Sequence, residues 1–191
     1  MNQILTLARL ESGTQTLTFY RLDVATHARS LAAAWQSAAD AAGLYLTVET
    51  PDTLEEIVDP EVLEHVLNNL LSNALKFTPP GGSIHVSMHP VPDGFSLRVA
   101  DTGVGMTPEV QARVFERYYQ GENPPHPLNE GVGIGLSLVQ ELVHLHRGTI
   151  TVTSTPGMGS TFEVVFPQGA ATAEAPAIND GAPGATVSTV K

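Results

Sequence analysis

NNLLSNALKF, residues 68–77, places three asparagines among leucines in a segment whose apolar spacing predicts a helix. Asparagine is a poor helix former, because its side chain competes with the backbone for hydrogen bonds. Polar residues recur at intervals of three and four on a face away from the leucines: Glu61, His65, Asn69, Asn73 and Lys76. Two amide oxygens and an ammonium on one face can hold a divalent cation and its phosphates, since Mg²⁺ prefers oxygen ligands. The alternative is an ordinary solvated face.

The pattern around this helix predicts an α+β fold. Asp59 and Pro60 provide an N-cap and a first helical position, and the helix ends at TPPGG, residues 78–82. Antiparallel hairpins alternate with amphipathic helices, so we expect a two-layer α/β sandwich whose mixed sheet has about five strands and about three helices on one face. Strands are expected at 17–22, 44–49, 55–58, 83–90, 94–101, 149–155 and 160–167, and helices at 23–42, 60–77, 134–146 and within 108–119.

Composition excludes several classes of function. The chain has 191 residues, a hydrophobic fraction of 42%, a formal net charge of −11 and no cysteine. An acidic chain is a poor partner for nucleic acid, and the lack of cysteine excludes disulfides and thiolate metal sites. No apolar run approaches the roughly 18 residues that span a bilayer, and the N-terminus is not a secretory signal. We therefore expect no contact of this segment with nucleic acid or membrane.

Two glycine-rich motifs add to the asparagine helix. DTGVGM, residues 101–106, places a carboxylate at the end of an apolar strand, and its glycines allow a ligand to approach the backbone. GVGIGLSL, residues 131–138, leads into a helix whose free N–H groups favour anions. It is not a dinucleotide fingerprint, because no buried strand precedes it, and the chain has no P-loop lysine motif.

In this order the motifs resemble the ATP-binding catalytic domain of sensor histidine kinases, in the superfamily that includes DNA gyrase. HVLNNLLSNALKFTPPGG (65–82) is similar to the N box, DTGVGM to the first glycine box and VFERYYQGE (114–122) to the F box. EGVGIGLSLVQELV (130–143) resembles the second glycine box, and GMGSTFEVVFP (157–167) the closing strand pair. The resemblance covers about residues 5–167 and implies the Bergerat ATP-binding fold.

The resemblance also implies roles for individual residues. The implied catalytic residues are Asn73 as the Mg²⁺ ligand, Asn69 as its polar partner one turn earlier, and Lys76, which reaches toward the phosphates. Asp101 is implied to accept the adenine amino group. Residues 106–132 match the mobile ATP lid. The implied ATP-binding residues are Asn73, Lys76, Phe77, Asp101, Gly103, Gly105, Met106, Phe115, Arg117, Tyr119, Gly131, Val132, Gly133, Ile134, Gly135, Leu136 and, on the closing strand, Thr161.

The implied domain organisation has three parts. Residues 1–16 resemble the end of a dimerisation helix and its linker, residues 17–167 the catalytic domain, and residues 168–191, rich in Ala, Gly, Pro, Ser and Thr, a disordered tail. The implied partners are the dimerisation domain of the same kinase, which carries the phosphoacceptor, and the receiver domain of a response regulator. The implied location is the cytoplasm, with any membrane anchor in an upstream region.

The implied function is transfer of the γ-phosphoryl group of ATP to a histidine of another domain. Gyrase-like relatives have a glutamate base where this chain has Asn69, and an amide cannot activate water, so ATP is protected from hydrolysis. None of the 7 histidines has an acceptor-like context. Gln120, where the family usually has arginine, weakens the case for transfer. Two alternatives are a serine-kinase anti-sigma factor on the same fold and a non-enzymatic ATP-sensing interaction module.

Overall fold

The computed structural model describes residues 14–119, 133–168 and 186–190, together with residues 6, 10 and 12. Within them, no helix is long and apolar enough to cross a membrane. The described helices are α2 (Val24–Ala34), α3 (Gln36–Ala41), α4 (Pro60–Phe77), α5 (Pro108–Arg113) and α6 (Gly135–Leu145). The described strands are β1 (Leu17–Asp23), β2 (Tyr45–Glu49), β3 (Glu55–Val58), β4 (Ser83–Val91), β5 (Gly94–Asp101), β6 (Thr149–Thr155), β7 (Gly159–Pro167) and β8 (Thr186–Val190).

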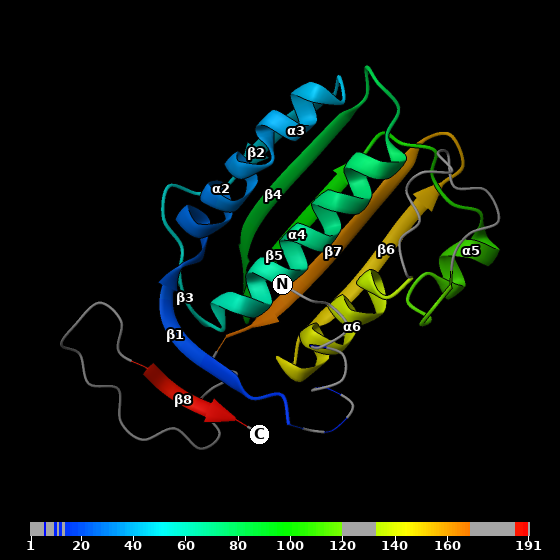
Figure 1. The fold of residues 1–191 in the computed structure, drawn as a ribbon. Coiled ribbons are helices and arrows are strands. Elements are labelled where there is room, and N and C mark those ends of the chain that lie inside the picture. Colours follow the sequence, from blue (N-terminus) through cyan, green and yellow to red (C-terminus); the bar gives the residue numbers. More distant parts are fainter. Residues whose placement is uncertain are drawn as a thin grey trace.

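A five-stranded mixed sheet forms one layer, in the order β2-β4-β5-β7-β6. Strand β2 runs parallel to β4, and every other pair in this sheet is antiparallel. Helices α2, α4 and α6 cover one face of the sheet, with α4 over its centre (Figure 1). The expected two-layer α+β architecture is therefore confirmed. A second small sheet, in the order β3-β1-β8, was not expected.

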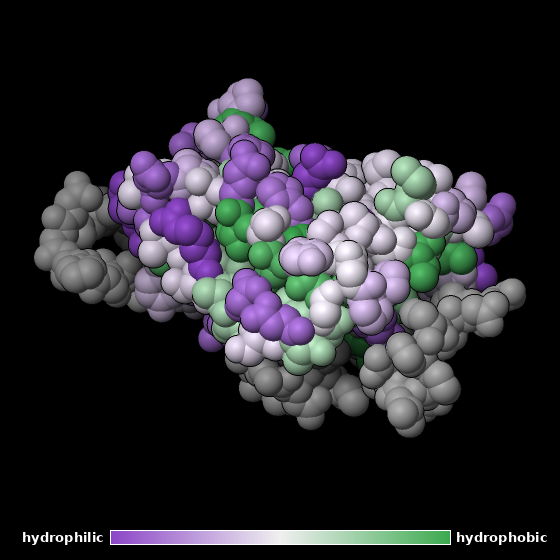
Figure 2. Space-filling view, turned by 90° about the horizontal axis from the view of Figure 1, so that it is seen from above, coloured by the Kyte–Doolittle hydropathy of each residue, from purple (hydrophilic) through white to green (hydrophobic). Residues whose placement is uncertain are grey.

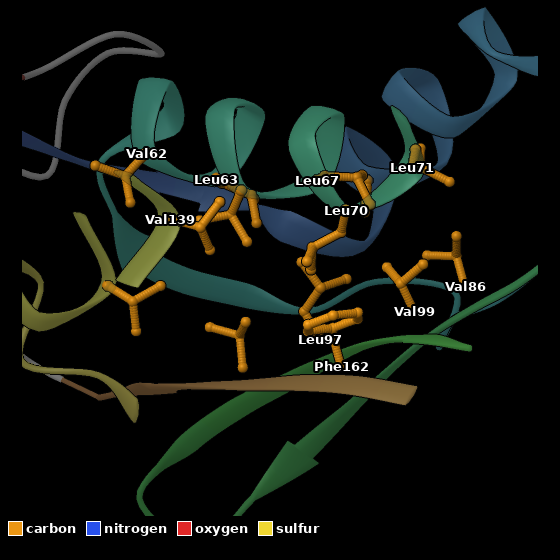
Figure 3. Close-up of a cluster of buried hydrophobic side chains, with 14 of the residues drawn as sticks. Val62, Leu63, Leu67, Leu70, Leu71, Val86, Leu97, Val99, Val139 and Phe162 are labelled. Atoms are coloured by element: carbon orange, nitrogen blue, oxygen red, sulfur yellow. The ribbon is translucent and has the colours of Figure 1, made fainter. Parts of the chain in front are cut away.

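Helix α4 begins and packs as its sequence pattern predicts. The carboxylate of Asp59 accepts hydrogen bonds from the backbone N–H groups of Glu61 (2.9 Å) and Val62 (3.3 Å), which caps the helix. Its leucines and valines point toward the side chains of the sheet, where they form the core with residues such as Leu97 and Phe162 (Figure 3). Full burial of each such side chain stabilises the fold by about 1.5–3 kcal/mol.

The predicted helix over 23–42 is divided in two at Trp35. The backbone N–H of Trp35 bonds to Ala32 O at 3.0 Å, a tighter turn than the α-helix makes. The indole N–H of Trp35 donates to the amide oxygen of Asn68 on α4, at 2.8 Å. This bond explains the first of the three asparagines, because Asn68 joins the α2–α3 turn to α4.

The end of the chain differs from the disordered tail expected for residues 168–191. Most of that segment lies outside the described residues. Residues Thr186–Val190, however, form strand β8, which pairs antiparallel with β1. Threonine and valine have high β propensity, and β1 offers an unpaired edge to a short strand of that composition.

A buried histidine joins three elements at the N-terminal end of α4. The imidazole Nε2 of His146 accepts a hydrogen bond from the backbone N–H of Asp59 at 3.3 Å. Its ring lies between those of Phe19 and Phe166, at centroid distances of 4.9 and 5.0 Å. Burial lowers the pKa of His146, although the nearby Asp59 carboxylate acts in the opposite direction. His146 is therefore a packing residue of the core.

Polar residues line a cavity of about 490 Å³ at this same end of α4. The cavity lies beside the start of the helix, whereas Asn73 and Lys76 belong to the last two turns. It is therefore separate from the site that the motifs predict. The lining residues are Thr14, Gln15, Thr16, Thr18, Tyr20, Asp59, Pro60 and Glu61.

Candidate functional site

The polar face of α4 meets the first residue of α6. The side-chain N–H of Asn69 donates to His65 O at 2.8 Å, and Asn69 is buried. A Cβ atom built on Gly135 would lie 2.8 Å from the amide oxygen of Asn69. The amide of Asn69 therefore sits directly beside the N-terminus of α6. Asn73 follows one turn later, half-buried, and its side chain makes no hydrogen bond within the described part of the chain.

The N-terminus of α6 has no side-chain cap. Ile134 is the N-cap residue, and among the described residues no side-chain oxygen caps the first N–H groups of the 11-residue helix. Those N–H groups and the helix dipole favour a negatively charged ligand. Gly133 (φ +71°) and Gly135 lie here as predicted, with Ile134 buried and Leu136 half-buried. The predicted residues Gly131 and Val132 lie outside the described residues.

Asp101 ends β5 with one carboxylate oxygen already occupied. Its Oδ1 accepts hydrogen bonds from the backbone N–H groups of Gly103 (2.8 Å) and Ser160 (3.3 Å). Its Oδ2 makes no bond to the described residues, so it can accept from a ligand. Burial raises the pKa of Asp101, and the two backbone donors oppose that shift.

The loop after Asp101 lies across the last turn of α4. The backbone N–H of Val104 donates to Phe77 O at 3.1 Å. Gly105 has φ +65°, and a Cβ atom there would collide with the carbonyl oxygen of Thr155, so only glycine fits. The end of β5, the last turn of α4 and the β6–β7 turn therefore meet at one end of the molecule. Seen from that end, hydrophobic side chains gather near the centre of the surface, between hydrophilic ones (Figure 2).

The described lid residues pack near this end. The ring of Phe115 makes an edge contact with Phe162 of β7, with centroids 6.3 Å apart, and Met106 also packs against the core. Tyr119 stacks under the guanidinium of Arg113, 4.3 Å from its ring centroid. The backbone N–H of Tyr118 donates to Gly133 O at 2.9 Å, although Tyr118 has φ +61°.

Two cations were expected near the ligand, and each has a neighbour in the structure. Arg117 lies 3.5 Å from a carboxylate oxygen of Glu141 on α6, an exposed pair that contributes little to stability. The ammonium of Lys76 lies 5.1 Å from the ring centroid of Phe77. Lys76 is only half-buried, so its flexible side chain can still extend from the end of α4 toward an anion.

Strand register separates Thr161 from the predicted site. Ser160 lies opposite Asp101, whereas Thr161 lies opposite Ala100. Since successive side chains of a strand point to opposite faces, Thr161 lies on the other face of the sheet from the Asp101 carboxylate. Ser160 is the residue that sequence reasoning missed. Its signal was available, because the buried Phe162 places Ser160 on the core-facing side of β7.

The site residues can hold Mg²⁺ only together with a ligand. The described residues include no cluster of three or more His, Cys, Asp or Glu side chains that could bind a metal alone. Asn73 offers one amide oxygen one turn after Asn69, whose own amide lies beside the start of α6. Mg²⁺ usually keeps several waters and takes one or two protein oxygens plus substrate phosphates, so this donor set fits Mg²⁺ bound with a phosphorylated ligand.

Comparison with known proteins agrees with this arrangement. Residues 58–170 match the family model of histidine kinase-, DNA gyrase B- and HSP90-like ATPases. The chain is 37% identical over 169 residues to sensor histidine kinase TmoS of Ectopseudomonas mendocina, covering 87% of this chain and 17% of TmoS. It is 33% identical to sensor-like histidine kinase SenX3 of Mycobacterium tuberculosis, covering 86% of this chain and 40% of SenX3. The chain thus spans less than half of these relatives.

Solved structures have the same fold. Full-length ShkA in complex with AMPPNP superposes with a TM-score of 0.75 at 26% identity, covering 88% of this chain and 36% of ShkA. The catalytic domain of histidine kinase ThkA, in a nucleotide-free form, superposes with a TM-score of 0.69 at 20% identity, covering 78% of this chain and 97% of that domain.

Proposed function

Because the chain belongs to the family of histidine kinase-, DNA gyrase B- and HSP90-like ATPases and is homologous to the catalytic domains of sensor histidine kinases, we propose that it binds Mg-ATP and donates the γ-phosphoryl group to a histidine. The acceptor histidine belongs to a dimerisation domain of the same kinase, and a response regulator aspartate then receives the group. Residues 17–167 form the catalytic domain, after a linker at 1–16 and before a tail at 168–191.

Base recognition is the task of Asp101 in this proposal. Its Oδ1 is held by two backbone N–H groups, which leaves Oδ2 to accept a hydrogen bond from the adenine amino group. Guanine carries a carbonyl oxygen at that position, and an oxygen facing the carboxylate is repelled. The related ShkA was solved in complex with AMPPNP, which supports nucleotide binding by a protein of this fold.

The phosphates lie between α4 and α6 in this proposal. Mg²⁺ held at this site would supply neutralisation of the charge on the phosphates. Asn73 provides its protein ligand, while the uncapped N–H groups of α6 and the ammonium of Lys76 bind phosphate oxygens. An amide adds no negative charge beside the triphosphate, as a carboxylate would.

Transfer rather than hydrolysis follows from Asn69. Its side-chain N–H is engaged by His65 O and its oxygen faces Gly135, so it orients the start of α6 and cannot remove a proton from water. The γ-phosphoryl group is then available to an imidazole that another domain brings into line, and the site contributes positioning and charge neutralisation.

One observation supports this proposal most directly: Asn69 of α4 lies beside the start of α6, and Phe77 at the end of the same helix lies beside the loop that follows Asp101. Asn73→Ala should lower the affinity for Mg-ATP at least about tenfold by calorimetry, while affinity without Mg²⁺ changes little. Asn68→Ala is the matched control, since its amide faces Trp35. Equal loss in both variants would contradict the assignment.

The transfer step needs the acceptor domain. Labelled ATP, this chain and the purified dimerisation domain of the same kinase should produce a phosphoprotein that acid destroys, because phosphohistidine is acid-labile. An acid-stable product would indicate a serine kinase. Intact ATP binding with no transfer would indicate a nucleotide sensor.

A further inference from the structure

Ser154, near the end of β6, joins the two loops that surround the Asp101 carboxylate. Its hydroxyl accepts a hydrogen bond from the backbone N–H of Met106 at 2.8 Å. The same oxygen lies 2.8 Å from Gly159 O, to which it donates, and 3.0 Å from the hydroxyl of Ser160. One half-buried side chain therefore connects the loop after β5 with the β6–β7 turn.

Strand geometry explains why these groups meet. Ser154 lies opposite Ser160 in the antiparallel β6–β7 pair. The backbone N–H of Ser154 donates outward to the side-chain oxygen of Gln111 on α5, at 2.8 Å, and not to β7. The two serines therefore form a non-hydrogen-bonded pair, in which side chains lie closest, and Gln111 covers the N–H of an edge strand.

A single peptide unit carries the effect of Ser154 to Asp101. The carbonyl of Gly159 and the N–H of Ser160 belong to the same planar unit and point in opposite directions. Ser154 binds the carbonyl end at 2.8 Å, and the N–H end donates to Asp101 Oδ1 at 3.3 Å. Hydrogen bonds in such a chain also polarise one another. The orientation of the carboxylate therefore depends on the Ser154 hydroxyl.

We propose that Ser154 is a positioning residue for base recognition: it orients the Gly159–Ser160 peptide and the Met106 loop so that Asp101 Oδ2 faces the purine amino group. The inference rests on the proposed function and adds a residue that touches no part of the nucleotide. In this proposal Ser154 helps the site to distinguish a purine with an amino group at position 6 from one without it, and its role is not general stabilisation of the site.

The test compares ATP with purine riboside 5′-triphosphate, which lacks the 6-amino group. Ser154→Ala should weaken ATP binding by about five- to tenfold in calorimetry, the effect of one lost hydrogen bond, and weaken binding of the analogue by less than about twofold. The preference for ATP over the analogue should therefore fall. Ser154→Thr, which retains a hydroxyl, should restore the preference.

Two control variants test whether Ser154 acts by orienting the Asp101 carboxylate or only by stabilising the fold. Gln111→Leu removes the acceptor of the Ser154 N–H but leaves its hydroxyl, so the preference should stay within about twofold of the parent value. Thr151→Ala changes an exposed position of the same strand and should have no effect. If Ser154→Ala does not fold, Ser154→Cys provides the same comparison, because its thiol is nearly as small and bonds weakly.

The outcomes distinguish this inference from the function on which it rests. A parent protein that binds neither nucleotide would refute the proposed function. A parent that prefers ATP, with a Ser154→Ala variant that loses the same factor for both nucleotides or for neither, would overturn the role of Ser154 and leave the proposed function in place.

Discussion

Burial favours the protonated form of Asp101, whereas the proposed recognition of adenine uses the ionised carboxylate. Burial raises its pKa, yet acceptance of an adenine amino group requires the ionised carboxylate. The native state therefore binds a proton at a higher pH than the unfolded chain does. Above the raised pKa both states are ionised, and the native state carries the cost of the buried charge. As pH falls through the raised pKa, that cost is relieved.

Asp101→Asn should lower the affinity for ATP and raise the free energy of unfolding. Asparagine keeps an oxygen for the N–H groups of Gly103 and Ser160 but turns an amide N–H toward the ligand, so ATP affinity should fall at least about tenfold. The free energy of unfolding at pH 7, from urea denaturation, should exceed that of the parent. The difference should shrink as pH falls through the raised pKa of Asp101, because the parent carboxylate then becomes protonated. A variant less stable than the parent at pH 7 would contradict this account.

Helix α4 has two polar faces: Asn68 faces the turn between α2 and α3, and Asn73 lies on the face that we propose binds the ligand. Asn68→Ala leaves the half-buried indole N–H of Trp35 without its acceptor, so the free energy of unfolding should fall by about 1–2 kcal/mol. Affinity for Mg-ATP should be unchanged, because Asn68 faces away from Asn73. Urea denaturation measures the first quantity and calorimetry the second. Ser72→Ala, at an exposed position of α4, should change neither, and an equal effect there would exclude the Trp35 bond as the cause.

The end of α6 holds a residue with an unfavourable backbone conformation. Arg147 has φ +60°, a region that glycine adopts without strain, and its N–H bonds to His144 O at 2.8 Å as in a helix C-cap. Arg147→Gly should release about 1–2 kcal/mol of strain and lose about half of that to the greater freedom of the unfolded chain. The midpoint of thermal unfolding should therefore rise by a few degrees. Arg147→Ala keeps the strain, so a similar rise in that variant would refute the explanation.

At the scale of the whole molecule, His146 connects the small sheet, the start of α4 and the end of α6. Protonation would remove the lone pair that accepts the N–H of Asp59 and would charge a buried ring. Because the folded pKa is lowered, the unfolded chain binds the proton first as pH falls. The stabilising contribution of the neutral ring is therefore complete above the unfolded pKa of about 6.5 and declines below it.

His146→Gln should flatten that pH dependence. Glutamine retains an acceptor for the Asp59 N–H but has no proton to gain, so its free energy of unfolding should vary less between pH 7.5 and 5 than that of the parent. Urea denaturation at several pH values measures the slope. His144→Gln, at an exposed position of α6, should keep the slope of the parent. Parallel slopes in the parent and His146→Gln would exclude His146 as the source.

Local signals were enough to predict most helices and strands, whereas contacts between distant residues were not predictable. Asp59, Pro60 and the TPPGG turn determine the ends of α4 within the sequence itself. The partners of Asn68 and His146 lie 33 and 87 positions away, and no periodic pattern identifies them. The roles of Asp101 and the asparagines stay predictions from the resemblance. For β7 the resemblance named Thr161, whereas the strand register places Ser160 opposite Asp101. Ser154 became visible only through the pairing of β6 with β7.

The bond between Tyr118 N and Gly133 O has a consequence for how such domains diversify. Because Tyr118 and Gly133 are hydrogen-bonded to each other, the two ends of the intervening segment lie together, so the number of residues between them is not constrained by any distance to be bridged. Closure entropy grows slowly with length, by about 0.6 kcal/mol for each doubling. A segment inserted between those two anchors can thus be lengthened, shortened or exchanged in evolution at little energetic penalty.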